Sequence, residues 1–503
     1  MIEIISQLLN PLTIGIIIAG CVGGIILGAV PGLNGGIGIS LMLPFTFTMS
    51  PADSLLLLGG IYMGSTYGGA ISAILINVPG GAEAYCTMLE GHPMAKAKRG
   101  KEALYLAALA SICGGLMGVI ALIAAAPALA RFALRFGPPE FFLIGMVGLT
   151  VVGSLTGKNA LKGVASACFG LIIGMIGFDT ISGGNRLNFG SDTMVMGIEL
   201  MAVVLGFFAL SEMLDQIVKI HKNKTTKIDQ KDAIVDLGDI TFFQTVKSVL
   251  KYNKFLLTKS CLIGTFLGIL PGPGAAISAF VAYGEAKRSY PKESFGTGNP
   301  RGIIAAESSN NACVGGSLVP MMALGIPGSP TAAIMYGALV IHGLQIGPRL
   351  FVDNKVFAYT FSWGMLLTVV VMGIVGIFCV PLFSRILKVN MRYIILTVIM
   401  CSLLGAFSIR NSMFDVFVTI ILGFVGYYLN KFGFPTAPIV LGLILSGLIE
   451  RNFRLSLVIS GAGDQSLFTY IFTRPLCIGI VVLGVMLILL NFRSMAMDKK
   501  RKT

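Results

Sequence analysis

The sequence predicts an all-α polytopic membrane protein, and three observations support this fold class. Hydrophobic residues make up 55% of the 503 residues and charged residues only 12%, whereas a soluble domain carries about a quarter charged residues. The mean hydropathy is +0.85. Apolar runs recur along nearly the whole chain, for example at 12–30, 103–126, 194–214 and 357–380, and roughly 17–25 such residues cross a bilayer. We expect roughly 10–12 transmembrane helices, together with broken or re-entrant helices.

The net charge of +14 comes largely from short loops. Basic residues concentrate at 96–101, 219–232, 285–292 and in the C-terminal tail. Short basic loops between spans mark the cytoplasmic side, so we interpret them as topology determinants and not as a nucleic-acid surface. A docking surface for a partner is the alternative interpretation. The first ten residues include Glu3 and no basic residue, so we expect no cleavable signal peptide. The nine scattered cysteines contain no CxxC pair and predict neither a disulfide framework nor a metal site.

A phrase near the start of the chain returns in its second half. "GGIILGAVPGLNGGIGIS" occupies 23–40 and "IGTFLGILPGPGAAISAF" occupies 263–280. At one constant offset, Gly24, Gly28, Pro31 and Gly32 align with Gly264, Gly268, Pro271 and Gly272. Further on, Gly68-Gly69 and Val78-Pro79-Gly80 match Gly315-Gly316 and Ile326-Pro327-Gly328 with one residue of slippage. We therefore predict a first transmembrane repeat at 1–218, a basic cytoplasmic linker at 219–254, a second repeat at 255–492 and a basic cytoplasmic tail at 493–503.

Equivalent loops of the two repeats differ in charge. The loop at 47–54 has no basic residue, while its counterpart at 285–301 has several. Conversely, 92–101 is strongly basic and its counterpart at 342–354 is nearly balanced. The positive-inside rule then places equivalent loops on opposite faces. This predicts inverted-topology repeats, which secondary transporters use for alternating access. A parallel duplication with a weak charge bias is the alternative.

Proline and glycine interrupt the apolar run at corresponding places in the two repeats. A break at membrane depth is tolerated only where protein or a water-filled cavity covers the freed backbone groups. The N–H groups at the start of a half-helix attract anions, and the carbonyls at its end attract cations. The breaks therefore predict a site for an anionic substrate and a coupling cation. We assign ion coupling to Pro31, Gly32, Pro271 and Gly272, with backbone carbonyls near Gly32 and Gly272 as candidate Na⁺ ligands.

Neutral polar side chains gather near these breaks and before a second Pro-Gly pair in each repeat. Hydroxyl and amide groups can bind carboxylate oxygens through their donors or Na⁺ through their oxygens. The predicted substrate-binding residues are Asn34, Ser65, Thr66, Asn77, Gly80, Ser308, Asn310, Asn311, Gly328, Ser329 and Thr331. Glu307 is the acid embedded among them, and an intramembrane carboxylate is a functional candidate. We assign it to ion coupling, as a proton carrier or cation ligand; a structural cap at a helix start is the alternative.

Several phrases together carry a family resemblance. They are "GAVPGLNGGIGISLMLPFTF", "GIYMGSTYGGAISAILINVPG", "EGHPMAKAKRG", "LPGPGAAISAFVAYGEAKR", "AESSNNACVGGSLVPMMALGIPGSPTAA" and "GLQIGPRLF". In this order they resemble the large membrane subunit of tripartite tricarboxylate transporters, over 20–100 and 264–351. One phrase departs from the family. Where Asp-Gly-Tyr-Pro-Met is expected, this chain has Glu90-Gly91-His92-Pro93-Met94, which leaves the role of this loop open.

The resemblance implies a multi-pass permease of the bacterial inner membrane. It would take up tri- or dicarboxylates with a Na⁺ or H⁺ gradient, through an elevator-type movement. The implied partners are a small four-helix membrane subunit and a periplasmic solute-binding protein, with no cofactor and no nucleic acid. A gradient-passive anion or solute channel is the alternative, because broken helices also line pores. An enzyme is not expected, because the sequence has no recognisable nucleophile–base or metal-ligand arrangement.

Overall fold

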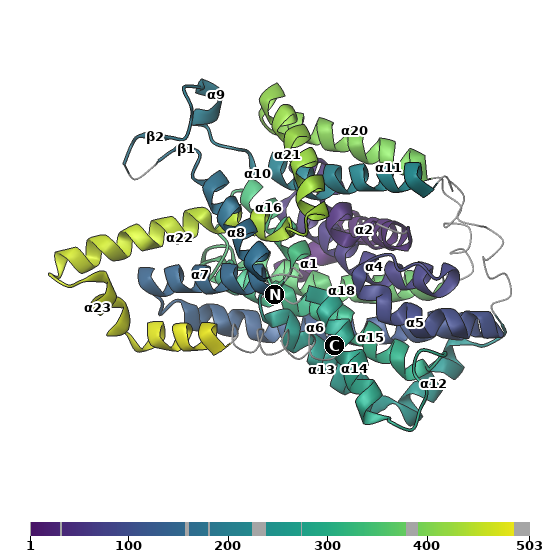
Figure 1. The fold of residues 1–503 in the computed structure, drawn as a ribbon. Coiled ribbons are helices and arrows are strands. Elements are labelled where there is room, and N and C mark those ends of the chain that lie inside the picture. Colours follow the sequence, from purple (N-terminus) through teal and green to yellow (C-terminus); the bar gives the residue numbers. More distant parts are fainter. Residues whose placement is uncertain are drawn as a thin grey trace, which may run out of the picture. The chain divides into compact units, whose positions relative to one another are not determined.

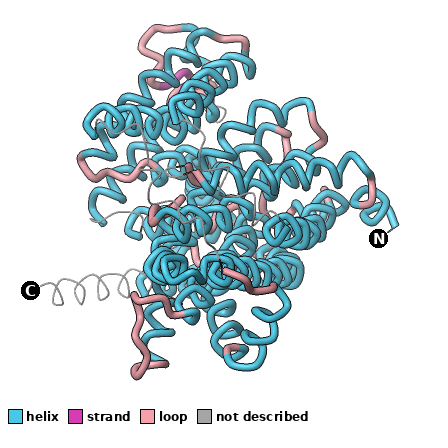
Figure 2. Tube along the Cα trace, turned by 90° about the vertical axis from the view of Figure 1, so that its right-hand side faces the viewer, coloured by secondary structure: helices cyan, strands magenta, loops and turns pink. Residues whose placement is uncertain are grey.

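The protein is helical almost throughout (Figures 1 and 2). The computed structural model describes residues 2–30, 33–155, 160–179, 182–223, 238–272, 274–378 and 391–486. Within these ranges the strands are β1 (Gly177–Phe178) and β2 (Asn185–Arg186), which pair antiparallel. The all-α prediction is confirmed. Of the features assigned from the sequence, Pro31, Gly32, the linker segment 224–237 and the tail 493–503 lie outside the described residues.

The chain folds into two compact units that interleave along the sequence. Unit 1 contains 1–130 and 212–405, and unit 2 contains 131–211 and 406–503. Each half of the sequence therefore contributes to both units. The repeat boundaries predicted above follow sequence similarity and not compactness, so they stay a prediction.

Unit 1 holds every residue assigned to binding or coupling. Its first segment forms α1 (Ile2–Leu8), α2 (Pro11–Ala29), α3 (Gly35–Met42), η1 (Leu43–Thr48), α4 (Pro51–Ile76), η2 (Ala82–Ala84), α5 (Tyr85–Met94), η3 (Ala95–Arg99) and α6 (Gly100–Ala133). Its second segment forms α11 (Ser211–Asn223), α12 (Phe242–Tyr252), α13 (Lys254–Ile269), α14 (Gly274–Ser289), α15 (Pro300–Leu324), α16 (Pro330–Ile341), α17 (Leu350–Asp353), α18 (Lys355–Phe378) and α20 (Met391–Arg410).

Unit 2 is a smaller helical unit. Its helices are α7 (Pro138–Leu155), α8 (Ala160–Gly174), α9 (Asp192–Val195), α10 (Leu200–Val204), η4 (Leu205–Leu210), α21 (Met413–Lys431), α22 (Ala437–Ala462) and α23 (Leu467–Phe472). A partly buried ion pair joins Arg474 to Glu140 at 2.6 Å, and Arg454 pairs with Asp179 at 2.9 Å. These contacts tie residues that are distant in the sequence.

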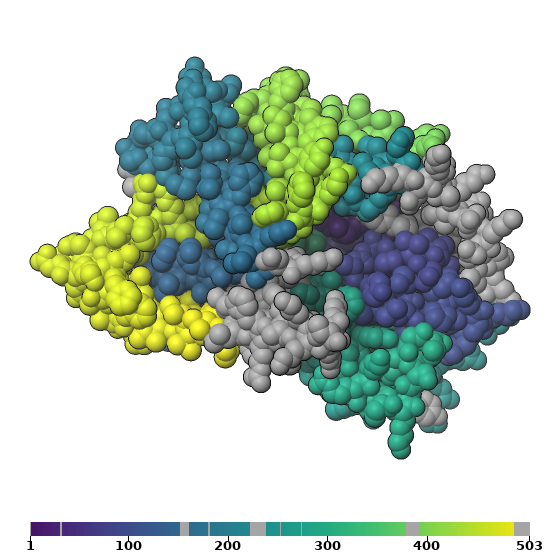
Figure 3. All heavy atoms as spheres, viewed as in Figure 1, coloured from purple at the N-terminus to yellow at the C-terminus, as the bar shows by residue number. Residues whose placement is uncertain are grey.

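Helix length and composition agree with a multi-pass membrane protein. Among the described residues, five helical segments are long and apolar enough to cross a membrane. They are Pro11–Ala29, Ala82–Ala133, Leu200–His221, Lys355–Phe378 and Met413–Lys431. Many large apolar side chains are exposed, including Phe468 and Val482 in the C-terminal segment, whose surface is coloured yellow in Figure 3. Such exposure suits contact with lipid.

Two helix pairs in unit 1 are built alike. The pair α2–α4 (purple and blue in Figure 1) packs through glycines, and so does the pair α13–α15. A Cβ added to Gly28 would lie 2.2 Å from the carbonyl oxygen of Ser65, and one added to Gly268 would lie 2.6 Å from that of Cys313. One turn earlier, a Cβ added to Gly24 would lie 2.6 Å from the carbonyl oxygen of Ile61, and one added to Gly264 would lie 2.1 Å from that of Ser309. Only glycine permits backbones to approach this closely.

These contacts also set the register between the repeats. A Cβ on Gly68 would lie 2.5 Å from the carbonyl oxygen of Ile25, and one on Gly316 would lie 2.6 Å from that of Thr265. Gly68 therefore corresponds to Gly316 and not to Gly315, which corrects the sequence alignment. The slippage disappears, and one constant offset relates α4 to α15 as far as the following Pro-Gly pair.

Candidate functional site

The second Pro-Gly pair of each repeat returns the chain to its helix pair. The N–H of Gly80 donates to the carbonyl of Gly69 at 3.3 Å, and a Cβ on Gly80 would lie 2.0 Å from the carbonyl oxygen of Gly28. Likewise, the N–H of Gly328 donates to the carbonyl of Ser317 at 3.1 Å, and its Cβ would lie 2.5 Å from the carbonyl oxygen of Gly268. The structure thus gives Gly80 and Gly328 a packing role that needs no ligand.

Three helix starts meet at the breaks. A Cβ on Gly35, the first residue of α3, would lie 3.6 Å from Cγ2 of Thr331 in α16. A Cβ on Gly274, the first residue of α14, would lie 4.0 Å from Cβ of Ser329. The N-terminal N–H groups of a helix lack partners within it and attract anions. The starts of α3, α14 and α16 therefore offer such N–H groups close to the Pro-Gly segments.

Capping side chains fix two of these starts. Asn34 Oδ1 accepts a hydrogen bond from the N–H of Ile37 at 3.1 Å, and Ser329 Oγ accepts one from the N–H of Ala332 at 3.1 Å. Asn and Ser are preferred caps because their side-chain oxygens satisfy N–H groups of the first turn. Both residues were predicted to bind substrate. The structure places them at the edge of the meeting point, already engaged as caps.

Helix α4 contributes hydroxyl groups to the same place. A Cβ on Gly35 would lie 2.5 Å from Ser65 Oγ, so this hydroxyl adjoins the start of α3. Tyr62 Oη lies 2.7 Å from Ser329 Oγ and is buried. Ser65 and Thr66 donate to the Tyr62 carbonyl at 3.1 and 2.9 Å. Tyr62 was not among the residues predicted from the sequence, although a tyrosine among small residues in a buried helix needs a partner for its hydroxyl.

Four other predicted residues lie outside this meeting point or contribute only backbone. Asn77 is exposed at the C-terminal end of α4, where φ is 56° and it acts as a left-handed cap. Ser308 donates to the carbonyl of Ile304 at 2.7 Å within its own helix. Pro271 is half-buried and precedes Gly272, whose φ is 112° and whose N–H donates to the carbonyl of Gly328 at 3.1 Å. That bond joins the two breaks of the second repeat.

A second polar cluster lies between α5, α6 and α15. Thr87 of α5 and Ser111 of α6 both donate to the carboxylate of Glu307, the latter at 3.2 Å. Asn311 Nδ2 donates to Ser111 Oγ at 2.9 Å and to Asn310 Oδ1 at 2.8 Å. All five residues are 0% exposed. The structure therefore groups Glu307, Asn310 and Asn311 with two hydroxyls that the sequence did not point to.

Glu90 ties α5 to the loop that precedes α15. Its carboxylate is 0% exposed and accepts hydrogen bonds from the successive N–H groups of 296–299 at 2.5–3.2 Å. Tyr283 Oη donates to the same carboxylate at 2.8 Å. Nearby, Nδ1 of His92 lies 3.1 Å from the carbonyl oxygen of Ile74. The segment 90–94, which the sequence treated as a loop of open role, lies within α5. Through Glu90 it ties the two halves of unit 1 together.

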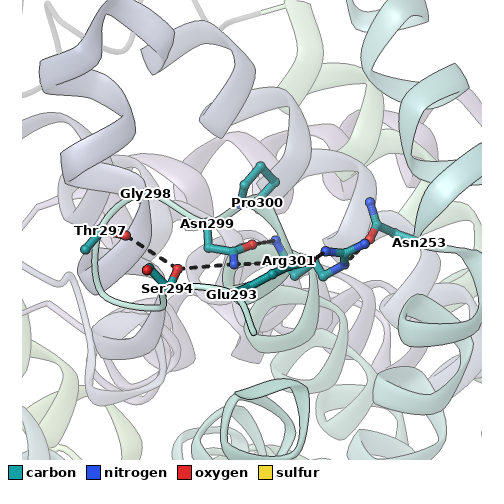
Figure 4. A pocket seen from close by; sticks show the side chains of 8 residues that line it. All are labelled: Asn253, Glu293, Ser294, Thr297, Gly298, Asn299, Pro300 and Arg301. Carbon is teal, nitrogen blue, oxygen red and sulfur yellow. Dashed lines mark hydrogen bonds and ion pairs between the residues drawn. The ribbon is translucent and has the colours of Figure 1, made fainter. Parts of the chain in front are cut away.

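An open cavity of about 380 Å³ lies at the start of α15 (Figure 4). It is lined by Asn253, Glu293, Ser294, Thr297, Gly298, Asn299, Pro300 and Arg301. Arg301 pairs with Glu293, donates to Asn253 Oδ1 at 2.8 Å and lies 4.1 Å from the ring centre of Tyr290. Its charge is thus compensated locally. None of the residues assigned to substrate or ion binding lines this cavity.

Comparison with known proteins identifies the family. A family model described as "Tripartite tricarboxylate transporter TctA family" matches residues 14–441. An Agrobacterium vitis protein described as "Uncharacterized 52.8 kDa protein in TAR-I ttuC' 3'region" is 31% identical over 510 aligned residues, covering 100% of this chain and 99% of that protein. A second protein from that organism, "Uncharacterized protein in TAR-II ttuC' 3'region", is 30% identical over 45% of this chain and 93% of its own length. No solved structure matches the chain. The chain therefore belongs to the tripartite tricarboxylate transporter TctA family.

Proposed function

We propose that this membrane component of a tricarboxylate transporter is a secondary-active permease, which carries small tri- or dicarboxylates across the bacterial inner membrane. The observation that carries the proposal is the meeting of the starts of α3, α14 and α16. Each start offers N–H groups to an anion without a charged side chain. Several starts in one place suit a substrate with more than one carboxylate. The runs at 20–40 and 263–280, which supply α3 and α14, are where the family resemblance begins.

The caps leave defined groups for the substrate. Because Asn34 engages Ile37 and Ser329 engages Ala332, the first-turn N–H groups of Gly35, Gly36 and Thr331 have no partner within their helices. Tyr62 and Ser65 place hydroxyl groups beside them, although the Ser65 hydroxyl donates to the Tyr62 carbonyl in this structure and would have to turn to reach a substrate. A carboxylate accepts such hydrogen bonds, and those to a charged group are the stronger ones. Substrate selection would then depend on the spacing of helix starts more than on formal charge.

Partners and energy supply complete the proposal. A tripartite system needs two further components, for which we propose a small membrane subunit and a periplasmic binding protein that delivers substrate. Accumulation against a gradient of a multiply charged anion needs coupling to a cation, Na⁺ or H⁺. Glu307 supports coupling to Na⁺ or H⁺, because it is a buried carboxylate that lies beside neutral oxygens. An elevator movement of one unit against the other is the mechanism proposed for alternating access.

Uptake into proteoliposomes tests the proposal. The chain is reconstituted with its small partner subunit, with and without a binding protein, and supplied with radiolabelled citrate and a panel of di- and tricarboxylates. An imposed Na⁺ or H⁺ gradient should drive accumulation of at least one carboxylate above its external concentration. Flux that only equilibrates under every gradient would contradict a carrier and point to a channel.

A further inference from the structure

The buried cluster on α15 has an uncompensated charge. Glu307 is 0% exposed, and among the described residues no Lys, Arg or His forms an ion pair with it. Its hydrogen-bond donors are the neutral hydroxyls of Thr87 and Ser111. Burying an ionised carboxylate without a counter-charge is very costly. The folded protein therefore needs a bound cation or a proton at this place.

The neighbouring amides favour a metal cation over a proton. Asn311 Nδ2 is satisfied by Ser111, Asn310 and the backbone carbonyl of Glu307, but Asn311 Oδ1 is buried and accepts no hydrogen bond. Nδ2 of Asn310 is also buried, and it has no hydrogen-bond partner among the described residues. A carboxyl proton on Glu307 would neutralise the carboxylate and engage at most one further oxygen. A metal cation takes several oxygen ligands, and the unpartnered Asn311 oxygen is a candidate among them.

The donor set determines the class of ion. Thr87 Oγ1, Ser111 Oγ, the Glu307 carboxylate and the amide oxygens of Asn310 and Asn311 are all hard oxygen donors, supplied by three helices. Oxygen ligands suit hard cations and not the softer metals that prefer sulfur or imidazole. Glu307 is the one carboxylate that forms hydrogen bonds in this cluster, whereas Glu83 of η2 interacts with it only electrostatically and shares none of these bonds. A single carboxylate ligand matches a monovalent ion better than Ca²⁺, whose sites usually supply several carboxylates.

We propose that Glu307, Asn311, Ser111 and Thr87 form a Na⁺ site between α5, α6 and α15. The site is distinct from the backbone carbonyls near Gly272 that the sequence suggested. Binding of the ion rests only on this geometry, whereas its role as the coupling ion rests on the proposed function. The ion would join α5 and α6 of the first repeat to α15 of the second. Its occupancy would therefore stabilise the contact between the two halves of unit 1.

Ion binding can be measured without substrate or partners. The full-length purified protein in detergent is titrated with NaCl, with choline chloride holding ionic strength constant, and both ²²Na⁺ binding and the melting temperature are recorded. We expect saturable binding and a rise in melting temperature with Na⁺. Ser111→Ala and Thr87→Val should weaken the apparent affinity for Na⁺ by roughly tenfold or more. Glu307→Gln should abolish binding.

Matched controls distinguish loss of the site from loss of the fold. Ser362 is also buried, and its hydroxyl donates only to the carbonyl of Ala358 within its own helix, so Ser362→Ala should bind Na⁺ like the wild type. Unchanged Na⁺ affinity in folded Ser111→Ala and Thr87→Val would overturn the site. A wild-type protein that binds no Na⁺ yet accumulates carboxylate with an H⁺ gradient would overturn the inference and keep the proposed function. Saturable, Ser111-dependent Na⁺ binding without carboxylate transport would support the ion site and contradict the proposed function.

Discussion

The helix pairs α2–α4 and α13–α15 share a backbone but not a chemistry. Both pairs pack through glycines at matching positions, and both receive a returning glycine, Gly80 or Gly328. In the register set by these contacts, Tyr62 of α4 corresponds to Asn310 of α15, and Gly59 of α4 corresponds to Glu307. The same framework thus occurs twice, while the side chains of the two long helices differ. Helix α4 places hydroxyl groups beside the helix starts, whereas α15 carries the buried acid Glu307 and the amides of Asn310 and Asn311.

Breaking the shared framework should have the largest effect, and it should be equal in the two pairs. Gly28→Ala and Gly268→Ala each place a Cβ within 2.6 Å of a backbone oxygen that cannot move independently of its helix. We expect each to destabilise the protein by roughly 3 kcal/mol or more. The measurement is folded yield and melting temperature in detergent. Gly23→Ala on the same helix is the control, because nothing lies within 4 Å of its Cβ position.

Removing the tie between the halves should have the next largest effect. Glu90→Gln keeps the size of the side chain but replaces one accepting oxygen with an amide donor that faces the N–H groups of 296–299. We expect a loss of about 2–4 kcal/mol, because hydrogen bonds to charged groups are strong and unsatisfied buried groups are costly. Glu90→Asp keeps the charge and should lose less. Equal melting temperatures for wild type and Glu90→Gln would show that the carboxylate charge is not needed.

A smaller effect should appear where α4 faces the helix starts. Tyr62→Phe removes the hydroxyl that lies 2.7 Å from Ser329 Oγ. We expect KM for the carboxylate to rise about fivefold, since one hydrogen bond contributes roughly 1 kcal/mol. Tyr67→Phe on the same helix is the matched control. The Tyr67 hydroxyl donates to the carbonyl of Gly376 at 3.3 Å, so KM should not change. A larger effect at Tyr67 than at Tyr62 would remove Tyr62 from the site.

The smallest effect should come from making the two long helices alike at their ends. Asn77 ends α4 with φ 56°, and Gly325 ends α15 with φ 74°. Asn77→Gly should change stability by about 0.5 kcal/mol or less, because both residues tolerate this conformation. It should leave uptake unchanged. A marked loss of uptake in a folded Asn77→Gly protein would restore Asn77 to the substrate site, where the sequence placed it.

The sequence predicted those features that depend on local sterics. Glycines at matching positions and Pro-Gly pairs limit the backbone wherever they occur, so the two matching segments and the interruptions of the apolar runs could be anticipated. The capping roles could not. Asparagine occurs both as a helix cap and as a substrate-binding residue, so the sequence alone does not separate the two roles. Only the structure shows that Asn34 and Asn77 are at helix ends.

The missed residues depend on partners that are distant in the chain. Thr87 is 220 residues from Glu307, and Ser111 is 200 residues from Asn311. Neither hydroxyl stands out in the sequence of its own helix, because its partner is set by the packing of α5 and α6 on α15. The same holds for Glu90, which accepts a hydrogen bond from the N–H of Gly296, 206 residues further along the chain. Tertiary packing, and not local propensity, selects these residues.

The bond set around Glu90 has a practical consequence for labelling this protein. Exposed loops usually accept inserted tags, because little depends on their backbone. The loop at 296–299 is different, because its consecutive N–H groups donate hydrogen bonds to the buried carboxylate of Glu90 in α5. An epitope inserted there would break the hydrogen bonds between these amides and Glu90, and it would destabilise the start of α15. Reporters for mapping which side of the membrane this region faces therefore belong elsewhere on the same side.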